Sequence, residues 1–307
     1  HGPFQIEASG LIFQMFGDSD FTARILYVIA GTILVGMPIL LRRRLGSLGS
    51  LFSSIMLAIS PTMLYFSRFA RNDILVVVWT FGLVVCIWRY IDEGKNRYLY
   101  VAAILLSLAF CTKETAYLIT ATLGAYLVLI RLSQTWPSAR SKIVFGQVSP
   151  PFAVYIIVSS IISSVSRILD HSRESRHTGF LIMLTTLTLP LWAAALSLFQ
   201  NTPLLNWSNL VLAAPVDGGG PIGAPLRGGN VLAVYFLVVL GLGSVYLGWR
   251  WRWAIWWRLT AIFYSIFFIL YTTFFSNPNG LGSGLWQSLG YWVVQQGEAR
   301  GNQPWYY

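Results

Sequence analysis

Charged residues are scarce in this chain of 307 residues. Only 10% of the residues are Asp, Glu, Lys or Arg, 55% are hydrophobic, and the mean hydropathy is +0.62. A soluble domain carries about 25% charged residues, so the deficit excludes an ordinary soluble protein. Several apolar runs approach or exceed the roughly 18 to 20 residues that cross a hydrocarbon core. The composition predicts an all-α, polytopic membrane helical bundle, because a helix satisfies its own backbone hydrogen bonds in lipid.

Cysteine is also rare. Cys86 and Cys111 are the two cysteines, and each lies in an apolar segment, so neither a disulfide framework nor a metal site is expected from them. The sequence contains no Walker loop, dinucleotide fingerprint, HExxH or CxxC motif, which argues against a nucleotide-driven pump. No cofactor follows from the residues, and a divalent metal ion stays an open alternative.

Acidic residues are outnumbered. The chain has 11 Asp and Glu against 21 Lys and Arg, a formal net charge of +10. Such an excess can indicate nucleic-acid binding, but loops on the cytoplasmic side of membrane proteins are enriched in Lys and Arg. We therefore expect no nucleic-acid partner. The triple arginine Arg42–Arg44 predicts that its short loop is cytoplasmic.

Apolar runs and short polar loops alternate along the chain. Membrane spans are expected near residues 24–41, 48–66, 74–91, 98–111 and 115–131, with further apolar runs at 143–165, 179–199, 231–248 and up to 275. If every run crosses once, the segment WRWRW falls on the outer face, against the charge rule. One run is therefore expected to be re-entrant, and the sequence does not say which. The tryptophans at 249–257 predict an interfacial aromatic belt.

The first apolar stretch, residues 3–16, is too short to span the membrane. It predicts a helix that lies at the membrane interface. Asp18 or Ser19 is expected to cap the helix that follows, because short polar side chains accept hydrogen bonds from the first backbone amides.

The loop SRFARND at 67–73 is predicted on the face opposite Arg42–Arg44. Its guanidiniums, Arg68 and Arg71, are three residues apart, and they share one face if the preceding helix extends that far. Arginine offers phosphate a planar fork of donors, so the loop, with Asp73, predicts a phosphate site. Snorkelling or an interfacial ion pair is the alternative.

The loop TKET at 112–115 supplies a second ionisable pair, Lys113 and Glu114, at another outward-facing helix end. A charge near the bilayer centre costs about 3 kcal/mol, so such a pair is expected at the interface or inside a polar cavity. A snorkelling pair in a short hairpin is the alternative.

The C-terminal segment 276–307 is rich in Asn, Gly, Trp, Tyr and Gln without a clear hydrophobic period. This composition predicts a folded loop with aromatic platforms and amide donors. Carbohydrate sites use such groups, because sugar C–H faces stack on aromatic rings and hydroxyls need hydrogen-bond partners. An interfacial aromatic girdle is the alternative.

Five stretches carry a resemblance to a known family: HGPF, FGDSDFTAR, ISPTMLYFSRFARNDIL, TKETAYL and the C-terminal segment through QPWYY. They resemble the archaeal and chloroflexus-type membrane proteins called flippase-activity-associated. These belong to the GT-C superfamily of polyprenyl-phosphate-sugar-dependent glycosyltransferases, which includes protein O-mannosyltransferases and lipid A aminoarabinose transferases. The resemblance covers about residues 1–131 and 250–307. It implies a GT-C-like bundle over 1–275, followed by an outer-face loop over 276–307.

The resemblance also implies a site and its partners. The donor would be a polyprenyl-phosphate sugar taken from the membrane lipid, the acceptor is unidentified, and the active face of this multi-pass cell-membrane protein would be extracytoplasmic. The residues that would bind the lipid phosphate are His1, Arg68, Arg71 and Lys113. Asp73 and Glu114 would orient those groups or the acceptor.

The catalytic carboxylate of the resembling enzymes lies upstream of HGPF, which here would precede residue 1. No catalytic residue is therefore assigned, and whether the chain is an enzyme stays open. The chain begins at His1 without an initiator methionine and ends abruptly at Tyr307, so we expect a fragment of a longer protein. The leading alternative is a non-catalytic lipid-linked sugar binding protein or flippase-associated partner. A transporter is a third, although no broken helix pair or repeated half is visible.

Overall fold

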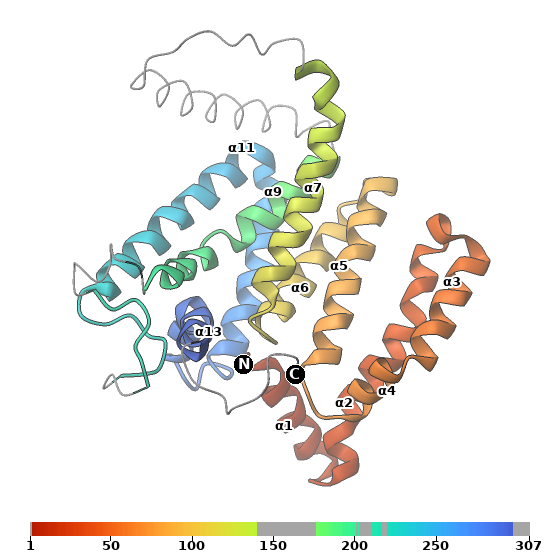
Figure 1. Ribbon diagram of the computed structural model, residues 1–307, viewed down its shortest axis with the longest axis horizontal. Coiled ribbons are helices and arrows are strands. Elements are labelled where there is room, and N and C mark those ends of the chain that lie inside the picture. The colour runs from red at the N-terminus through yellow and green to blue at the C-terminus, as the bar shows by residue number, and fades with distance from the viewer. Residues whose placement is uncertain (1, 140–175, 201, 203–209, 217–219, 297–307) are drawn as a thin grey trace.

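The protein is all-α, as the sequence predicts. The computed structural model describes residues 2–139, 176–200, 202, 210–216 and 220–296, and these form a helical membrane bundle (Figure 1). Within those ranges there is no β-strand, and the one isolated β-bridge joins Val211 to Leu226.

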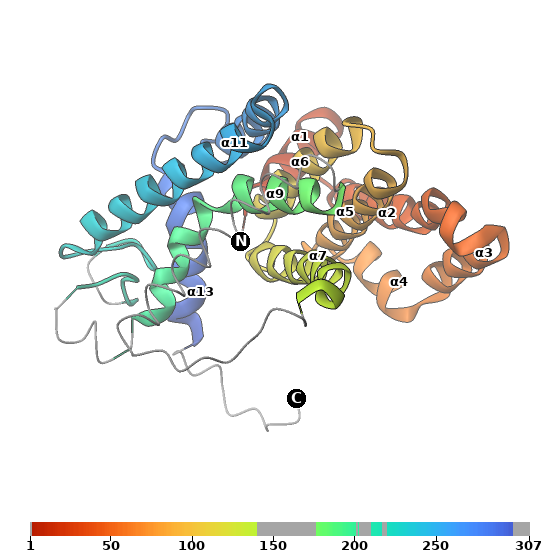
Figure 2. The same ribbon diagram turned by 90° about the horizontal axis from the view of Figure 1, so that it is seen from above.

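The helices follow one another through short connections. In chain order they are α1 Phe4–Phe16, α2 Asp20–Gly36, η1 Met37–Leu41, α3 Arg42–Ile59, α4 Pro61–Arg68, α5 Asp73–Glu93, α6 Arg97–Phe110, α7 Ala116–Ala139, α9 Arg176–Thr188, η2 Leu191–Phe199, α11 Gly229–Tyr271, α12 Gly280–Gly282, η3 Ser283–Gln287 and α13 Ser288–Gln296. Figure 2 shows α3 and α4 at one side of the bundle, α11 and α13 at the other, and α5, α6, α7 and α9 between them.

Within the described residues, three helical segments are long and apolar enough to cross a membrane: Asp20–Ile59, Asp73–Glu93 and Gly229–Tyr271. A fourth is added if α9 and η2, which meet at a bend of 67°, count as one span. The 21 residues of α5 cover about 30 Å at roughly 1.5 Å per residue, close to the thickness of the hydrocarbon core.

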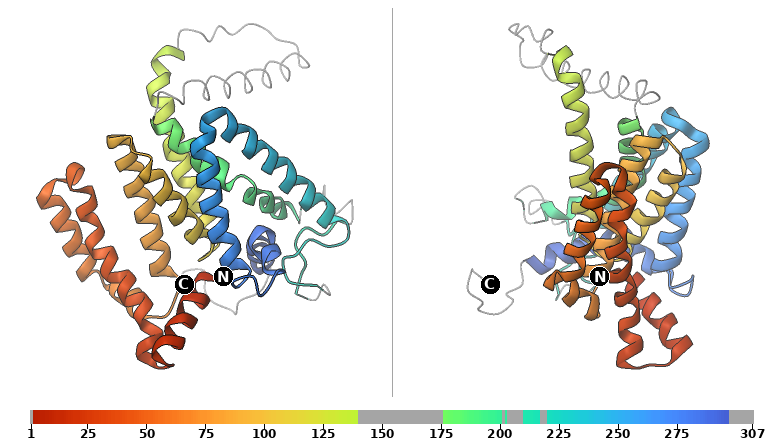
Figure 3. Two further views of the ribbon diagram at one scale, coloured as in Figure 1. Left: turned by 180° about the vertical axis from the view of Figure 1, so that it is seen from behind. Right: turned by 90° about the vertical axis from the view of Figure 1, so that its right-hand side faces the viewer.

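The first long segment is a hairpin. Figures 1 and 3 show α2 running along the bundle and α3 and α4 returning beside it. The reversal passes through η1 and Gly46, whose φ of 74° favours glycine. A second break separates α3 from α4, because the residue before Pro61 is pushed to an extended conformation. The run predicted as one span at 48–66 is therefore built from two helices, α3 and α4, with a break at Ser60.

The helix α11 also doubles back, with its break at Arg252 inside WRWRW. Its two arms match the runs predicted at 231–248 and up to 275. The tryptophans of the predicted belt divide into two groups: Trp251 and Trp256 are buried in the core, whereas Trp249, Trp253 and Trp257 are exposed.

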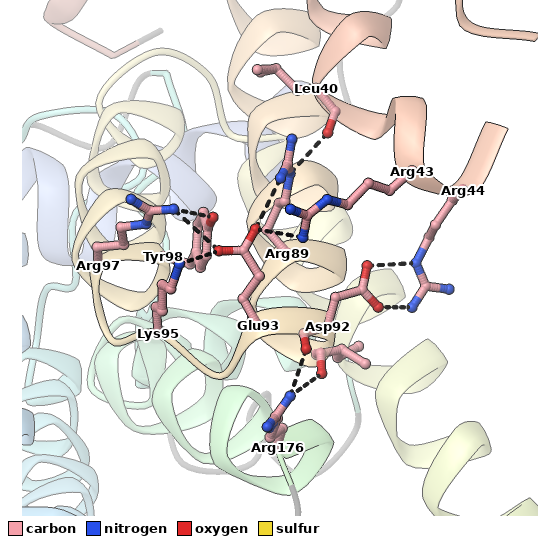
Figure 4. Close-up of polar contacts among 11 residues, drawn as sticks. Leu40, Arg43, Arg44, Arg89, Asp92, Glu93, Lys95, Arg97, Tyr98 and Arg176 are labelled. Atoms are coloured by element: carbon pink, nitrogen blue, oxygen red, sulfur yellow. Dashed lines mark hydrogen bonds and ion pairs between the residues drawn. The ribbon is translucent and has the colours of Figure 1, made fainter. Parts of the chain in front are cut away.

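One end of the bundle, named the basic end here, carries the start of α3, the end of α5 and the starts of α6 and α9 (Figure 4). Glu93 lies at its centre, and its carboxylate contacts the cations of Arg43, Arg89, Lys95 and Arg97 at 2.9 to 3.3 Å. The shared carboxylate ties α3 and α6 to the end of α5.

Asp92 adds a second contact to α3 and a first contact to α9 at the basic end. Its carboxylate accepts two hydrogen bonds from Arg44, and the Arg44 guanidinium stacks over Trp88 at 3.9 Å. Arg176 of α9 donates to the carbonyl oxygens of Ile91 and Asp92 at 2.9 and 2.8 Å. Figure 4 shows the hydrogen bonds of Arg44 to Asp92 and of Arg176 to the end of α5.

The opposite end carries SRFARND and TKET, one full length of α5 away from Glu93. Arg42–Arg44 and the two predicted charge clusters thus lie at different ends, as the sequence predicts. Which end is cytoplasmic stays a prediction.

The conflict over WRWRW is resolved. Figures 1 and 3 show that α7 ends, α9 begins and α11 bends at the basic end, and Arg252 donates to Asn96 at 3.5 Å. The tryptophan-rich bend therefore lies on the same side as Arg42–Arg44, in agreement with the charge rule. The run expected at 143–165 lies outside the described residues.

Two hydrophobic clusters hold the bundle together. The larger joins α5, α6, α7, α9, α11 and α13 and includes Leu99, Leu106, Phe180, Phe263 and Trp286. The smaller joins α2 to α5 through Tyr27, Leu34, Ile74 and Leu75. In lipid such contacts stabilise the bundle through van der Waals packing and interhelical hydrogen bonds, and they fix the positions of the helix ends described below.

The structures of the N-terminal and C-terminal segments agree in part with the predictions from the sequence. A helix does form over Phe4–Phe16, and its interfacial position stays a prediction. Ser19 caps α2, and its hydroxyl accepts from the Thr22 amide at 3.2 Å. Residues 280–296 are helical, although a loop was expected, because Trp286 is buried and its indole donates to the Leu212 carbonyl at 2.7 Å.

Candidate functional site

The two predicted charge clusters meet at the end opposite the basic end. Lys113 Nζ lies 2.7 Å from Asp73 Oδ1. Asp73 begins α5, and Lys113 lies in the turn between α6 and α7. The two residues meet because α6 packs against α5. The sequence suggests Lys113 and Glu114 as a local pair, but the structure pairs Lys113 with Asp73. Both side chains are about three-quarters buried.

Arg71 joins this pair on the same carboxylate. Its Nε lies 3.6 Å from Asp73 Oδ2, and its side chain is 56% exposed. Arg68 does not share a face with Arg71, because α4 ends at Arg68 and Phe69 is extended. Arg68 lines a separate cavity with Asp20 and Arg24. The expectation that both arginines form one helical face is therefore wrong.

The N-terminal segment closes over the TKET loop. The Gly2 amide donates to the Thr112 carbonyl at 3.2 Å, and the Phe4 amide donates to the Cys111 carbonyl at 2.9 Å. A Cβ atom on Gly2 would overlap the Cys111 carbonyl oxygen, so the approach requires glycine. His1, expected at the phosphate, lies outside the described residues.

A cavity of about 610 Å³, lined by charged and amide side chains as well as apolar and aromatic ones, opens beside Lys113 of the Asp73–Lys113 pair. We name it the α13 cavity. Lys113, Glu114 and Thr115 line one wall, Trp192 and Leu198 of η2 line another, and α13 supplies Tyr291, Trp292, Gln295 and Gln296. The aromatic and amide side chains expected of the C-terminal segment thus face the charged turn. Trp192 was missed, although a tryptophan directly after the helix break at Pro190 could have indicated it.

An apolar cavity of about 330 Å³ has Phe4 in its lining, and the Phe4 amide donates to the Cys111 carbonyl of the same turn. We name it the α2–α5 cavity. Its lining comes from α1, α2, α5 and α6 and includes Phe4, Ile33, Met37 and Trp79. The Trp79 indole donates to Thr112 Oγ1 at 3.1 Å. The turn at 111–115 therefore contacts the lining of the apolar cavity and contributes Lys113, Glu114 and Thr115 to the α13 cavity.

Two buried polar atoms at this end have no hydrogen-bond partner within the described part of the chain. They are Asn72 Oδ1, next to Asp73, and Thr115 Oγ1, in the wall of the α13 cavity. Such atoms are costly unless a partner is supplied. Cys111 is not a candidate nucleophile, because its side chain is fully buried.

Metal ligands do not converge in the described residues, where no group of three or more His, Cys, Asp or Glu side chains could hold an ion. What converges is a lysine, an arginine, two carboxylates, aromatic rings and amides, and these can bind an anion and a polyhydroxyl group.

The fold and this site define the class as a polytopic membrane protein with a cavity at one end of its helices that is lined by charged, amide and aromatic side chains. The family model for dolichyl-phosphate-mannose-protein mannosyltransferase matches residues 1–154, which include α1 to α7, SRFARND and TKET. The chain therefore belongs to this family, which supports the GT-C superfamily inferred from the sequence. No curated protein and no solved structure matches the chain.

Proposed function

We propose that the protein is a glycosyltransferase that takes its sugar from a polyprenyl-phosphate donor at the extracytoplasmic face of the membrane. Membership of the mannosyltransferase family supports the donor class. The orientation rests on the charge rule, which assigns Arg42–Arg44 to the cytoplasm. The narrower resemblance to flippase-associated proteins is part of this proposal.

One observation carries the proposal: the turn at 111–115 contacts the lining of the apolar α2–α5 cavity through Phe4 and Trp79, and it supplies charged and polar side chains to the α13 cavity. A lipid-linked sugar has the same division, an isoprenoid chain joined through phosphate to a sugar. The isoprenoid chain of the donor would lie in the α2–α5 cavity, where the lining is almost wholly apolar. The sugar would lie in the α13 cavity, with Trp192 and Trp292 as stacking platforms.

The charged groups would act on the phosphate and the acceptor. Lys113 and Arg71 would stabilise the negative charge that develops on the departing polyprenyl phosphate. Asp73 holds both cations in place through its two carboxylate oxygens. Glu114 is the carboxylate among the described residues that line the α13 cavity, and it would orient the acceptor hydroxyl for attack on the anomeric carbon.

The test is a transfer assay on the full-length protein in nanodiscs, with farnesyl phosphate carrying radiolabelled mannose. We expect release of farnesyl phosphate and loss of about a hundredfold in turnover for Glu114→Gln. Glu7→Gln on α1 is the matched control and should keep its turnover. Absence of both binding and turnover would contradict the proposal.

The same assay separates the second candidate, a non-catalytic lipid-linked sugar binding or flippase-associated partner. That function uses the same two cavities and predicts saturable binding of the donor with no release of farnesyl phosphate, in the wild-type protein and in Glu114→Gln alike.

A further inference from the structure

A further cavity with charged lining lies at the end of the bundle that carries SRFARND and TKET, opposite the basic end and apart from the α13 cavity. It measures about 530 Å³ and is lined by Asp20, Ala23 and Arg24 of α2, by Leu64, Tyr65 and Arg68 of α4, and by Phe69 and Ala70. The start of α2 lies beside the end of α4 because the two helices run antiparallel (Figure 3). Their contact is close, since a Cβ on Gly31 would lie 2.6 Å from the Cβ of Ser67.

The two arginines of this cavity, Arg24 and Arg68, keep their guanidinium groups available to a ligand. In the described part of the chain, neither Arg24 nor Arg68 forms a salt bridge or a side-chain hydrogen bond, although Asp20 lines the same space. Two guanidiniums against one carboxylate leave a net charge of +1 in the lining. A phosphodiester, with one negative charge, complements it.

An apolar groove continues from the cavity. A hollow of about 260 Å³ between α2, α3 and α4 shares Leu64 and Arg68 with it, and Val28, Val35, Leu57 and Met63 contribute to the walls. Tyr65 and Phe69 stack at the rim, with ring centroids 5.4 Å apart. Aromatic side chains at this level are typical of the membrane–water interface.

We propose that this pair of hollows is a binding site for an anionic membrane phospholipid. The phosphate would bind Arg24 and Arg68, and one acyl chain would lie in the groove beside Leu64. Guanidinium groups bind phosphate oxygens through a planar fork of donors, so two of them in one cavity suit a phosphodiester headgroup. The site is separate from the proposed donor site, because the Arg24–Arg68 cavity and the α13 cavity share no lining residue.

The test uses the full chain in phosphatidylcholine vesicles that contain a minor fraction of spin-labelled phosphatidylglycerol. The measured quantity is the association constant of phosphatidylglycerol relative to phosphatidylcholine. Arg24→Ala and Arg68→Ala should each lower it roughly tenfold, whereas Arg42→Ala, an exposed arginine at the basic end, should leave it unchanged. Equal loss at Arg42 would overturn the proposal, since it would show general surface electrostatics.

A third variant, Asp20→Asn, is expected to raise the affinity for phosphatidylglycerol, a result that misfolding would not produce. Asp20→Asn removes the one negative charge of the lining, so phosphatidylglycerol should bind several times more tightly. No change or a loss would overturn the proposal.

Two competitors identify the source of the phosphate. Excess inorganic phosphate should displace little lipid, because it has no acyl chain for the groove; full displacement would assign the cavity to a free anion and overturn the proposal. Farnesyl phosphate should bind Arg24→Ala and Arg68→Ala as it binds the wild type. Loss of farnesyl phosphate binding in these variants would assign the cavity to the donor and also overturn the proposal.

Discussion

Lys113 Nζ and Asp73 Oδ1 lie 2.7 Å apart although 40 residues separate them in the chain. The contact joins the turn before α7 to the first residue of α5 and holds the charged wall of the α13 cavity. Because both side chains are largely buried, we expect each single alanine variant to lose about 1 to 3 kcal/mol of unfolding free energy. The double variant Asp73→Ala/Lys113→Ala should lose less than the sum. Additive losses of unfolding free energy in detergent would show that the two side chains are not energetically coupled.

Gly2 and Gly10 offer a matched comparison near the N-terminus. Gly2→Ala places a methyl group against the Cys111 carbonyl, whereas a Cβ on Gly10 meets nothing within 4 Å. We expect Gly2→Ala to release the N-terminal segment and to speed proteolysis within residues 1–16. Gly10→Ala should leave proteolysis unchanged or slow it, because alanine favours the helix by about 1 kcal/mol. Similar cleavage of both variants would mean that the segment is not held by the contacts at Cys111 and Thr112.

Glu93 is expected to stabilise the fold more than any single cation around it. Its side chain is 10% exposed, whereas that of Arg43 is 68% exposed. Glu93→Gln leaves four cations close together without their shared carboxylate, and we expect a clear fall in the midpoint of thermal denaturation. Arg43→Gln removes one exposed pair and should cost below about 1 kcal/mol. Thermal denaturation in one detergent compares them, and equal midpoints would show that the network contributes little.

Membrane orientation can be measured with cysteine labelling at positions 43 and 69, which lie at opposite ends of the bundle. The natural cysteines, Cys86 and Cys111, are buried and should react slowly. An impermeant reagent added outside intact cells should label Phe69→Cys and spare Arg43→Cys, because the triple arginine is expected in the cytoplasm. Labelling of Arg43→Cys alone would invert the orientation and place the α13 cavity inside.

Hydropathy and local signals predict much of this fold. The all-α membrane bundle, the Ser19 cap and the placement of Arg42–Arg44 opposite SRFARND follow from patterns within a few dozen residues. The break at Pro61 was also present in the sequence, but the apolar run through it concealed the change from α3 to α4.

The site was predicted less completely, because its contacts are distant in sequence. The pairing of Lys113 with Asp73 depends on how α5 and α6 pack, which one sequence does not specify. Arg68 and Arg71 separate because the chain is extended at Phe69, a backbone choice that residue spacing does not reveal. The aromatic and amide groups of α13 were expected, whereas the wall supplied by Trp192 was not.

The central claim is that the turn at 111–115 and Arg71 bind the phosphate of a lipid donor. Its most direct measurement is the dissociation constant of farnesyl phosphate for the full-length protein in nanodiscs. We predict that Arg71→Ala and Lys113→Ala each weaken binding roughly ten- to a hundredfold. Arg71→Lys should also weaken it, because an ammonium lacks the two-pronged match of guanidinium, and Arg42→Ala should have no effect. Equal losses at Arg42 and Arg71, or no loss at Arg71 and Lys113, would contradict the account.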